Sequence, residues 1–201
     1  MDAHLVPGRS CGACNVCCVV PAIDEPALQK LPGCRCHNAL PNGACAIYET
    51  RPRSCREFFC GWRRLKWIRE ELRPDVSGVF VTVVSEATLM KGADQPAVTF
   101  TLLDGAGPTV PGFAEVVAAA IHANVGAYLV VPGLPGYTGC SVRLNEVLGD
   151  AVRRRDKAAA LRILGEVRAE AQAATTAGEP VSLSSYTESG VDRPMRTSND
   201  P

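Results

Sequence analysis

The sequence predicts an α+β protein in which a cysteine-rich, metal-stapled N-terminal module is followed by a small α+β unit. Nine of the ten cysteines lie between Cys11 and Cys60, in a stretch with interspersed Gly and Pro and little helical periodicity. From Val76 onward, β-rich runs alternate with helical periodicities, which predicts about four strands and two to three helices. We therefore expect the metal-binding module at residues 1–74, the α+β unit at 75–174 and a disordered tail at 175–201.

The elements of the α+β unit follow from composition and spacing. Val, Phe and Thr dominate two of the predicted strands, and Gly, Asp and Pro bound them. Apolar residues recur at helical spacing in the predicted helices, and Asp156 is placed to cap the last one. In order, we expect a short amphipathic helix at 61–73 ended by Pro74, strands at 79–84 and 97–103, a helix at 113–125, strands at 127–131 and 140–144, and a helix at 156–173.

Composition narrows the class of protein. The chain has 201 residues, 46% of them hydrophobic, and a net charge of +0, which suits a folded globular protein. Without a global charge we expect neither nucleic acid nor membrane as a partner. No apolar run is long enough for a membrane span, and the first residues lack a signal-peptide core, so we predict a cytoplasmic protein. Stable disulfides are rare in a reducing cytosol, so closely spaced cysteines favour metal ligation.

The cysteine spacing suggests more than one metal ion. Cys11, Cys14 and Cys17 are separated by two residues each, which lets successive sulfurs turn toward a common centre in a zinc knuckle or a cluster-binding loop. The neighbouring side chains of Cys17 and Cys18 point in different directions, which favours two metal ions close in space. The downstream donors are Cys34, Cys36, His37, Cys45, Cys55 and Cys60. Two four-coordinate sites would use eight of these ten donors, and the sequence leaves their pairing open.

Two further features surround the cysteines. Arg51, Arg53 and Arg56 lie among the thiolates, where they would either offset the negative charge of a thiolate-rich site or solvate a loop. Trp62 and Trp67 are expected to pack the cysteine-rich module against the α+β unit.

The cysteine pattern resembles the YkgJ-like cysteine-cluster family, which is described as a zinc- or iron-chelating domain with a CxxCxxCC motif. The likeness covers roughly residues 11–62. It rests on Cys11-x2-Cys14-x2-Cys17-Cys18, then Gly33-x2-Cys36-His37, then Cys45-x-Ile-Tyr48-Glu49-x-Arg51-Pro52-x2-Cys55-Arg56-x-Phe58-x-Cys60-x-Trp62. The resemblance implies metal binding through Cys11, Cys14, Cys17, Cys18, Cys36, Cys45, Cys55 and Cys60, whereas Cys34 is an addition to the family pattern.

The sequence thus predicts a metal-binding cysteine-cluster protein that carries zinc or an iron–sulfur cluster. It contains no phosphate-binding loop, no nucleophile elbow and no His-Glu-x-x-His pair, so no catalytic residue is assigned. One alternative is a metal- or cluster-dependent enzyme that performs redox chemistry or modifies a protein or peptide. A second alternative is storage or delivery of metal ions. Metal ions are the expected partners, and a protein or peptide partner belongs to the enzyme alternative.

Overall fold

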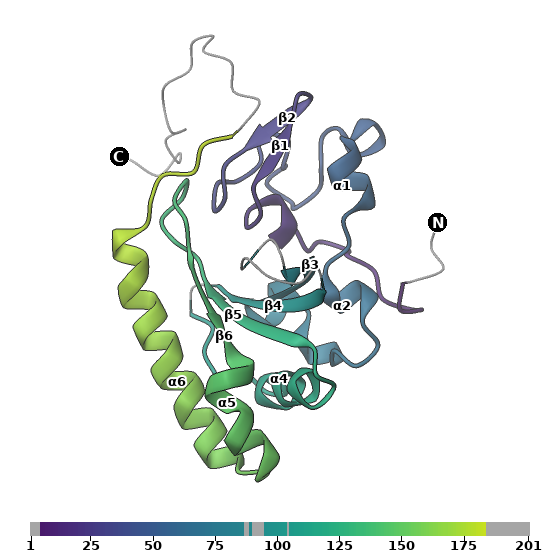
Figure 1. Ribbon diagram of the computed structural model, residues 1–201. Helices are drawn as coiled ribbons and strands as arrows, with labels where there is room; N and C mark the ends of the chain where they lie inside the picture. Colours follow the sequence, from purple (N-terminus) through teal and green to yellow (C-terminus); the bar gives the residue numbers. More distant parts are fainter. Residues whose placement is uncertain (1–4, 87–88, 90–94, 104, 184–201) are drawn as a thin grey trace.

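The computed structural model describes residues 5–86, 89, 95–103 and 105–183, which form a mixed α+β fold with one two-stranded and one four-stranded sheet (Figure 1). The larger sheet has the strand order β3-β4-β5-β6. It consists of β3 (Val79–Ser85), β4 (Pro96–Leu102), β5 (Gly126–Val131) and β6 (Cys140–Arg143). The outer pairs β3-β4 and β5-β6 are antiparallel, and the central pair β4-β5 is parallel.

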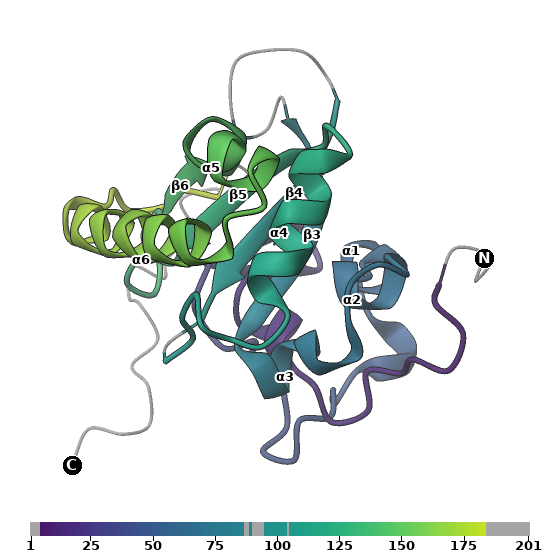
Figure 2. The same ribbon diagram turned by 90° about the horizontal axis from the view of Figure 1, so that it is seen from below.

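Three helices pack with this sheet. The parallel pair β4-β5 requires a crossover connection, which α4 (Phe113–His122) provides. α5 (Leu144–Arg153) and α6 (Lys157–Ala174) follow β6 and contact each other as well as the strands (Figure 2). Asp156 caps α6, because its carboxylate accepts a hydrogen bond from the Ala159 N–H at 2.9 Å.

The hydrophobic core is centred on β4 and α4. β4 is buried along nearly its whole length, as expected for a strand with neighbours on both edges and packing on both faces. Phe100 of β4 meets Phe113 of α4 edge to face, with ring centroids 5.7 Å apart. Trp62, Ile68 and Leu72 belong to the same core, so the chain on both sides of residue 74 contributes to one cluster. The division into two domains at that residue stays a prediction.

Most expected elements of the α+β unit are confirmed. The four strands and the helices at 113–125 and 156–173 occur within a few residues of their predicted bounds. We did not predict α5, although Leu144, Leu148, Ala151 and Val152 lie at helical spacing and are buried. The β-rich run that precedes Leu144 masked the start of that helix. Of the two tryptophans, Trp62 packs in the core, whereas Trp67 is 39% exposed.

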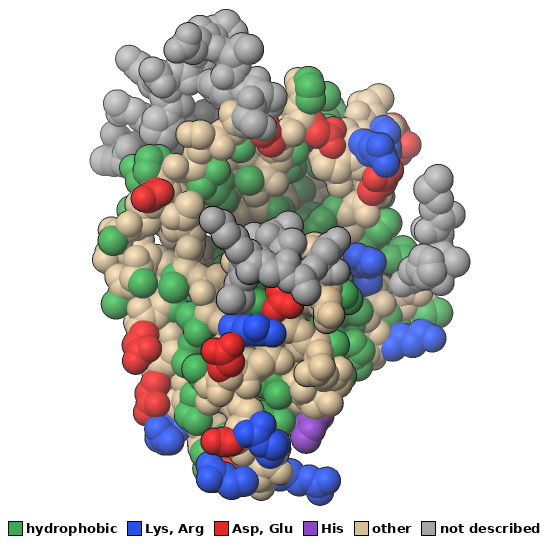
Figure 3. Space-filling view, viewed as in Figure 1, with side chains coloured by type: hydrophobic (Ala, Val, Ile, Leu, Met, Phe, Trp, Pro, Cys, Tyr) green, Lys and Arg blue, Asp and Glu red, His purple; other side chains and the backbone are tan. Residues whose placement is uncertain are grey.

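Charged side chains of both signs mix where α5 and α6 meet, on the face drawn in Figure 3. The pairs include Arg153 with Asp150 and Arg162 with Glu166, the latter at 2.8 Å. Their side chains are more than half exposed, so these pairs contribute little to stability.

The first residues of the predicted tail, 175–183, have a described structure. η5 (Thr175–Ala177) continues from α6, and the Val181 N–H donates to the Gly136 carbonyl at 2.8 Å. Residues 184–201 of the predicted tail lie outside the described residues. Within the described part of the chain, no helix combines the length and apolar character that a membrane span needs.

The N-terminal part of the chain consists of short elements. They are η1 (Val16–Cys18), the antiparallel hairpin β1 (Ile23–Glu25) and β2 (Leu28–Lys30), η2 (Tyr48–Thr50), α1 (Arg53–Glu57), α2 (Gly61–Arg64), η3 (Glu70–Leu72) and α3 (Pro74–Ser77). Among residues 5–60, which we call the cysteine-rich segment, the buried hydrophobic side chains are Val16, Leu28 and Cys36, together with Pro52. This segment therefore has little apolar core of its own.

The predicted helix at 61–73 is wrong. The chain forms α2 and η3 as separate turns, and Pro74 begins α3 instead of ending a helix. The cause is Arg9, whose guanidinium donates to the carbonyls of Trp62 and Ile68 at 2.5 and 2.6 Å and more weakly to Leu65 at 3.3 Å. A continuous helix would need those carbonyls for its own N–H groups.

Arg9 is also held by charge and by an aromatic ring. Its Nε lies 2.9 Å from a Glu70 carboxylate oxygen, and its guanidinium lies 5.0 Å from the centre of the Trp62 ring. The Arg9 side chain is only 9% exposed. It therefore ties the start of the described chain to the segment that enters the core.

Replacing Arg9 should destabilise the fold. Arg9→Met keeps an apolar stem but leaves buried carbonyls without their charged donor, so we expect the free energy of unfolding to fall by about 3 kcal/mol in urea denaturation. Arg162→Met on exposed α6 is the matched control and should change it by less than about 0.5 kcal/mol. Equal effects of the two variants would contradict the role of Arg9.

Candidate metal centre

All eight predicted ligand cysteines lie in the described chain, on turns and short helices outside the four-stranded sheet. Cys17 and Cys18 belong to η1, Cys55 lies in α1, and Cys60 is the residue that precedes α2. All ten cysteines are free thiols. Cys11 is exposed, Cys36 is buried, and the other six predicted ligands are half-buried.

Local turns bring the first cysteines together. The Cys14 N–H donates to the Cys11 carbonyl at 2.9 Å, and Gly12 between them has a φ of +54°, a left-handed conformation that favours glycine. The Cys18 N–H then donates to the Asn15 carbonyl at 2.8 Å within the next turn. The Cys-x2-Cys repeats therefore lie in successive backbone turns, and a common centre for their sulfurs stays a prediction.

Backbone hydrogen bonds bring the central cysteines to Cys18. The Cys36 N–H donates to the Cys18 carbonyl at 2.8 Å, and the Ala39 N–H donates to the Cys36 carbonyl at 2.9 Å. Ala39 in turn forms an antiparallel bridge with Cys45. These bonds link residues that lie far apart in the sequence.

Cys18, Cys36 and Cys45 all lie within electrostatic range of Cys55, and we call these four residues the Cys36 group. Burial is the largest cause that raises the pKa of the Cys55 thiol, and the charges of Cys36, Cys18 and Cys45 raise it further.

A second cluster, the Cys11 group, contains Cys11, Cys14, Cys17 and Cys60. Cys17 lies within electrostatic range of Cys11 and Cys14, and Cys60 lies within range of Cys11. Burial raises the pKa of Cys14 and of Cys60, and neighbouring backbone N–H groups oppose this by stabilising the thiolates. By electrostatic proximity the eight cysteines can be sorted into two sets of four, with Cys17 and Cys18 also interacting between the sets.

The adjacent Cys17 and Cys18 connect the two groups. A hydrogen bond from the Cys17 thiol to the Cys18 sulfur is the largest cause that raises the pKa of Cys17 and lowers the pKa of Cys18 to about 6. Burial opposes the second shift, whereas the positive charges of Lys30, Arg35 and Arg51 favour it. The thiolate of this pair therefore lies on Cys18, on the side of the cations.

Of the three arginines singled out in the sequence, Arg51 is the one whose positive charge lowers the pKa of a predicted ligand, Cys18. The Arg51 guanidinium also stacks on the Tyr48 ring and lies 3.6 Å from the ring centre. Arg53 instead pairs with Glu57 at 2.8 Å on the exposed face of α1. Arg56 donates to the Arg51 carbonyl at 2.7 Å, which fixes the backbone beside the stacked arginine.

The remaining candidate donors lie differently. His37 is exposed, and Cys34 contributes its backbone carbonyl to the ammonium of Lys30. Sequence reasoning missed Lys30, Arg35 and Asp75, because nothing in their local sequence distinguishes them from ordinary surface charges. Their proximity to the sulfurs arises only in the folded chain.

The sulfurs are near neighbours but do not form a closed coordination sphere. No set of three or more His, Cys, Asp or Glu side chains in the described part of the chain is already arranged to hold a metal ion. The donor set, four thiols in each group, fits zinc or an iron–sulfur cluster in kind and number.

The comparisons with known proteins found no relative of this chain. No protein-family model matches the chain, and neither the curated proteins nor the solved structures contain a match. The likeness to the YkgJ-like family therefore rests on the cysteine motif alone.

Gly61 allows α2, and the preceding Cys60, to approach β3 closely. A Cβ atom at Gly61 would lie 2.5 Å from a Val81 methyl group of β3. Any side chain there would push α2, and with it Cys60, away from the strand.

Gly61→Ala should therefore lower the free energy of unfolding by about 1–3 kcal/mol in urea denaturation, because the added methyl group overpacks the contact with Val81. The control is Gly165→Ala in α6, where nothing lies within 4 Å of the added atom. This control should raise stability by up to about 1 kcal/mol through helix propensity. An unchanged free energy of unfolding in Gly61→Ala would show that α2 and β3 have room for the added methyl group.

Proposed function

We propose that the chain binds metal through its eight clustered cysteines, with one zinc ion or one iron–sulfur cluster in each group of four. Cys11, Cys14, Cys17 and Cys60 would hold one metal centre. Cys18, Cys36, Cys45 and Cys55 would hold the other. A zinc ion would supply a tetrahedral cross-link between turns, and an iron–sulfur cluster would supply a one-electron redox centre.

The observation that supports the proposal is the electrostatic proximity of the eight cysteines to one another in a segment that buries few apolar side chains. Cysteines distant in sequence, such as Cys18 and Cys55, come within electrostatic range of each other there. Clustered thiols that must share so little space are unfavourable as thiolates unless a cation lies between them. Metal bonds would supply the cohesion that the small apolar core of this segment lacks.

The charges around the sulfurs support the same function. Four thiolates on a divalent cation leave a net negative site, which nearby cations offset. Lys30, Arg35 and Arg51 provide positive charge beside Cys18, and Arg63 favours the Cys60 thiolate. On this account, binding draws the sulfurs of each group inward and displaces their protons.

The remaining alternatives differ in the role that the metal plays. A structural zinc site and a redox-active cluster use the same cysteines, and a cluster would serve a redox or protein-modifying enzyme. The resemblance to the YkgJ-like family supports chelation of zinc or iron, and a cytoplasmic location would keep the thiols reduced. An exposed ligand such as Cys11 favours storage or delivery for at least part of the metal.

Metal content tests the proposal. Protein purified without oxygen should contain about two zinc ions or about two iron–sulfur clusters per chain, measured by elemental analysis and by the absorption spectrum. A colourless protein would identify zinc, and a brown one that bleaches on reduction would identify a cluster.

Single substitutions should then remove one centre at a time. Cys14→Ser and Cys55→Ser should each lower the content to about one centre per chain, because each removes a ligand from a different group. Cys140→Ser, on β6 outside both groups, is the control and should leave the content unchanged. Less than one centre in the unaltered protein would overturn the proposal.

A further inference from the structure

The loop that joins β5 to β6, residues 132–139, is shaped by close backbone contacts rather than by buried side chains. A Cβ atom at Gly139 would lie 2.5 Å from the Val131 carbonyl oxygen, so the two ends of the loop approach each other closely. Leu134 and Tyr137 of this loop are 66% and 42% exposed. The loop therefore offers mainly its backbone groups to the segments beside it.

The C-terminal chain lies along one side of this loop. Residues 178–181, which we call the strap, follow η5 and form an antiparallel bridge with the loop between Pro180 and Tyr137 (Figure 1). The Thr138 N–H donates to the Glu179 carbonyl at 2.8 Å, and the Glu179 N–H donates to the Thr138 hydroxyl at 2.9 Å. Every residue of the strap is exposed or half-buried, so hydrogen bonds at the surface hold it in place.

Gly136 connects the strap to the cysteine-rich segment. Its carbonyl accepts the Val181 N–H at 2.8 Å, and its own N–H donates to the Pro32 carbonyl at 2.8 Å. Gly136 is buried and has a φ of +86°, a left-handed conformation that favours glycine. Next to it, a Cβ atom at Gly33 would lie 3.2 Å from the Cα atom of Pro135. The loop is thus held between the strap and the chain around Pro32.

The chain around Pro32 is tied in turn to the rest of the cysteine-rich segment. The Gly33 N–H donates to the Val20 carbonyl at 3.2 Å. Lys30 is only 5% exposed, and its ammonium donates to the Leu31 carbonyl at 3.1 Å. Hydrogen bonds therefore run from the strap through Gly136 and Pro32 to the chain that follows η1.

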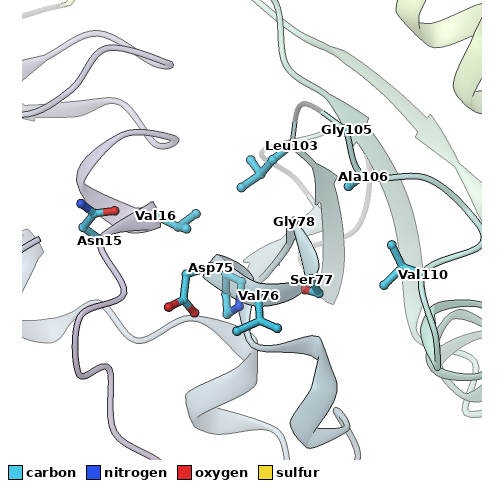
Figure 4. Close-up of a pocket in the computed structure, with 11 residues that line it drawn as sticks. Asn15, Val16, Asp75, Val76, Ser77, Gly78, Leu103, Gly105, Ala106 and Val110 are labelled. Atoms are coloured by element: carbon cyan, nitrogen blue, oxygen red, sulfur yellow. The ribbon is translucent and has the colours of Figure 1, made fainter.

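Elsewhere the packing between the cysteine-rich segment and the α+β unit is incomplete. A cavity of about 510 Å³ is lined on one side by Asn15 and Val16 and on the other by Leu103 and Val110, which lie between β4 and α4 (Figure 4). Side chains that line a cavity lose contacts on that side. The attachment through Gly136 therefore matters more for holding the two parts together.

From these contacts we infer that the strap is a latch that couples the C-terminal end of the chain to the cysteine-rich segment. When the strap leaves the loop, the hold of Gly136 on Pro32 weakens, while the core around Phe100 stays packed. The strap can leave without exposing core side chains, and elements held in this way open locally at a low free-energy cost. The coupling is reciprocal, so loosening the chain around Pro32 also loosens the strap. The inference is independent of the proposed function, because its contacts lie outside both cysteine groups.

Two truncations test the latch by amide hydrogen exchange of the protein as purified. Removal of residues 178–201 should speed exchange of the Gly136 and Gly33 amides at least about tenfold and leave the Phe100 amide of β4 unchanged. Removal of residues 184–201 alone keeps the strap and should change none of the three.

The opposite results are equally clear. Equal exchange at Gly136 in the two truncated chains overturns the inference, and so does a Gly136 amide that is already unprotected in the full chain. An equal acceleration at Phe100 also overturns it, because the strap would then stabilise the whole fold rather than one attachment.

A point variant tests the strap without removing residues. Gly178→Ala would place a Cβ atom 2.6 Å from the Thr138 carbonyl oxygen, so it should displace the strap and speed exchange at Gly33 at least about threefold. The matched control is Gly165→Ala in α6, where nothing lies within 4 Å of the added atom, and it should leave Gly33 unchanged. If the shorter truncated chain proves unfolded, an unchanged Gly33 amide in Gly178→Ala overturns the inference by itself.

Gly33→Ala tests the coupling in the reverse direction. Gly33 has a φ of +72° and lies against Pro135, so the added methyl group should speed exchange of the Val181 amide at least about threefold. Gly105→Ala is the matched control, because Gly105 has a φ of +80° with nothing within 4 Å of the added atom. Equal exchange of the Val181 amide in the two variants would show that the strap and the cysteine-rich segment are not coupled.

Discussion

The main constraint on this structure is that the cysteine-rich segment buries very little apolar surface. Val16, Leu28 and Cys36, together with Pro52, are the buried hydrophobic side chains among residues 5–60. Burial of apolar surface is the main contribution that stabilises a fold, so this segment gains little cohesion from its own core. Under the proposed function, sulfur–metal bonds supply most of the remaining cohesion.

The four-stranded sheet serves as the platform on which this segment rests. Its own core needs no metal, because β4 and α4 bury a continuous set of apolar side chains around Phe100 and Phe113. Two contacts connect the sulfurs to that core. Gly61 lets Cys60 approach β3 closely, and Arg9 holds the carbonyls of the chain that carries Trp62 into the core. The position of Cys60 is thus fixed from the sheet, while most other ligands are fixed by short turns.

The sequence was sufficient for elements whose signal is local, and it failed where the cause is distant. Runs such as 79–84 and the cap Asp156 carry their own signal, so the strands and α6 were predicted. The helix at 61–73 was wrong because Arg9, far upstream, takes the carbonyls that a helix would use. The hairpin β1-β2 was missed because its strands are three residues each. The cysteines were evident from spacing, but which of them lie near one another, and the proximity of Lys30 and Asp75 to them, depend on tertiary contacts.

The central claim is that cations bound by the cysteines hold residues 5–60 in shape while the sheet stands by itself. Amide hydrogen exchange of the full chain, with its metal and after anaerobic removal of all metal, tests this most directly. The account predicts that amides such as Cys14, Cys18 and Cys36 lose protection when the metal is removed, while those of β4 and β5 keep theirs. Unchanged protection of the cysteine-rich segment in metal-free, reduced protein would contradict it.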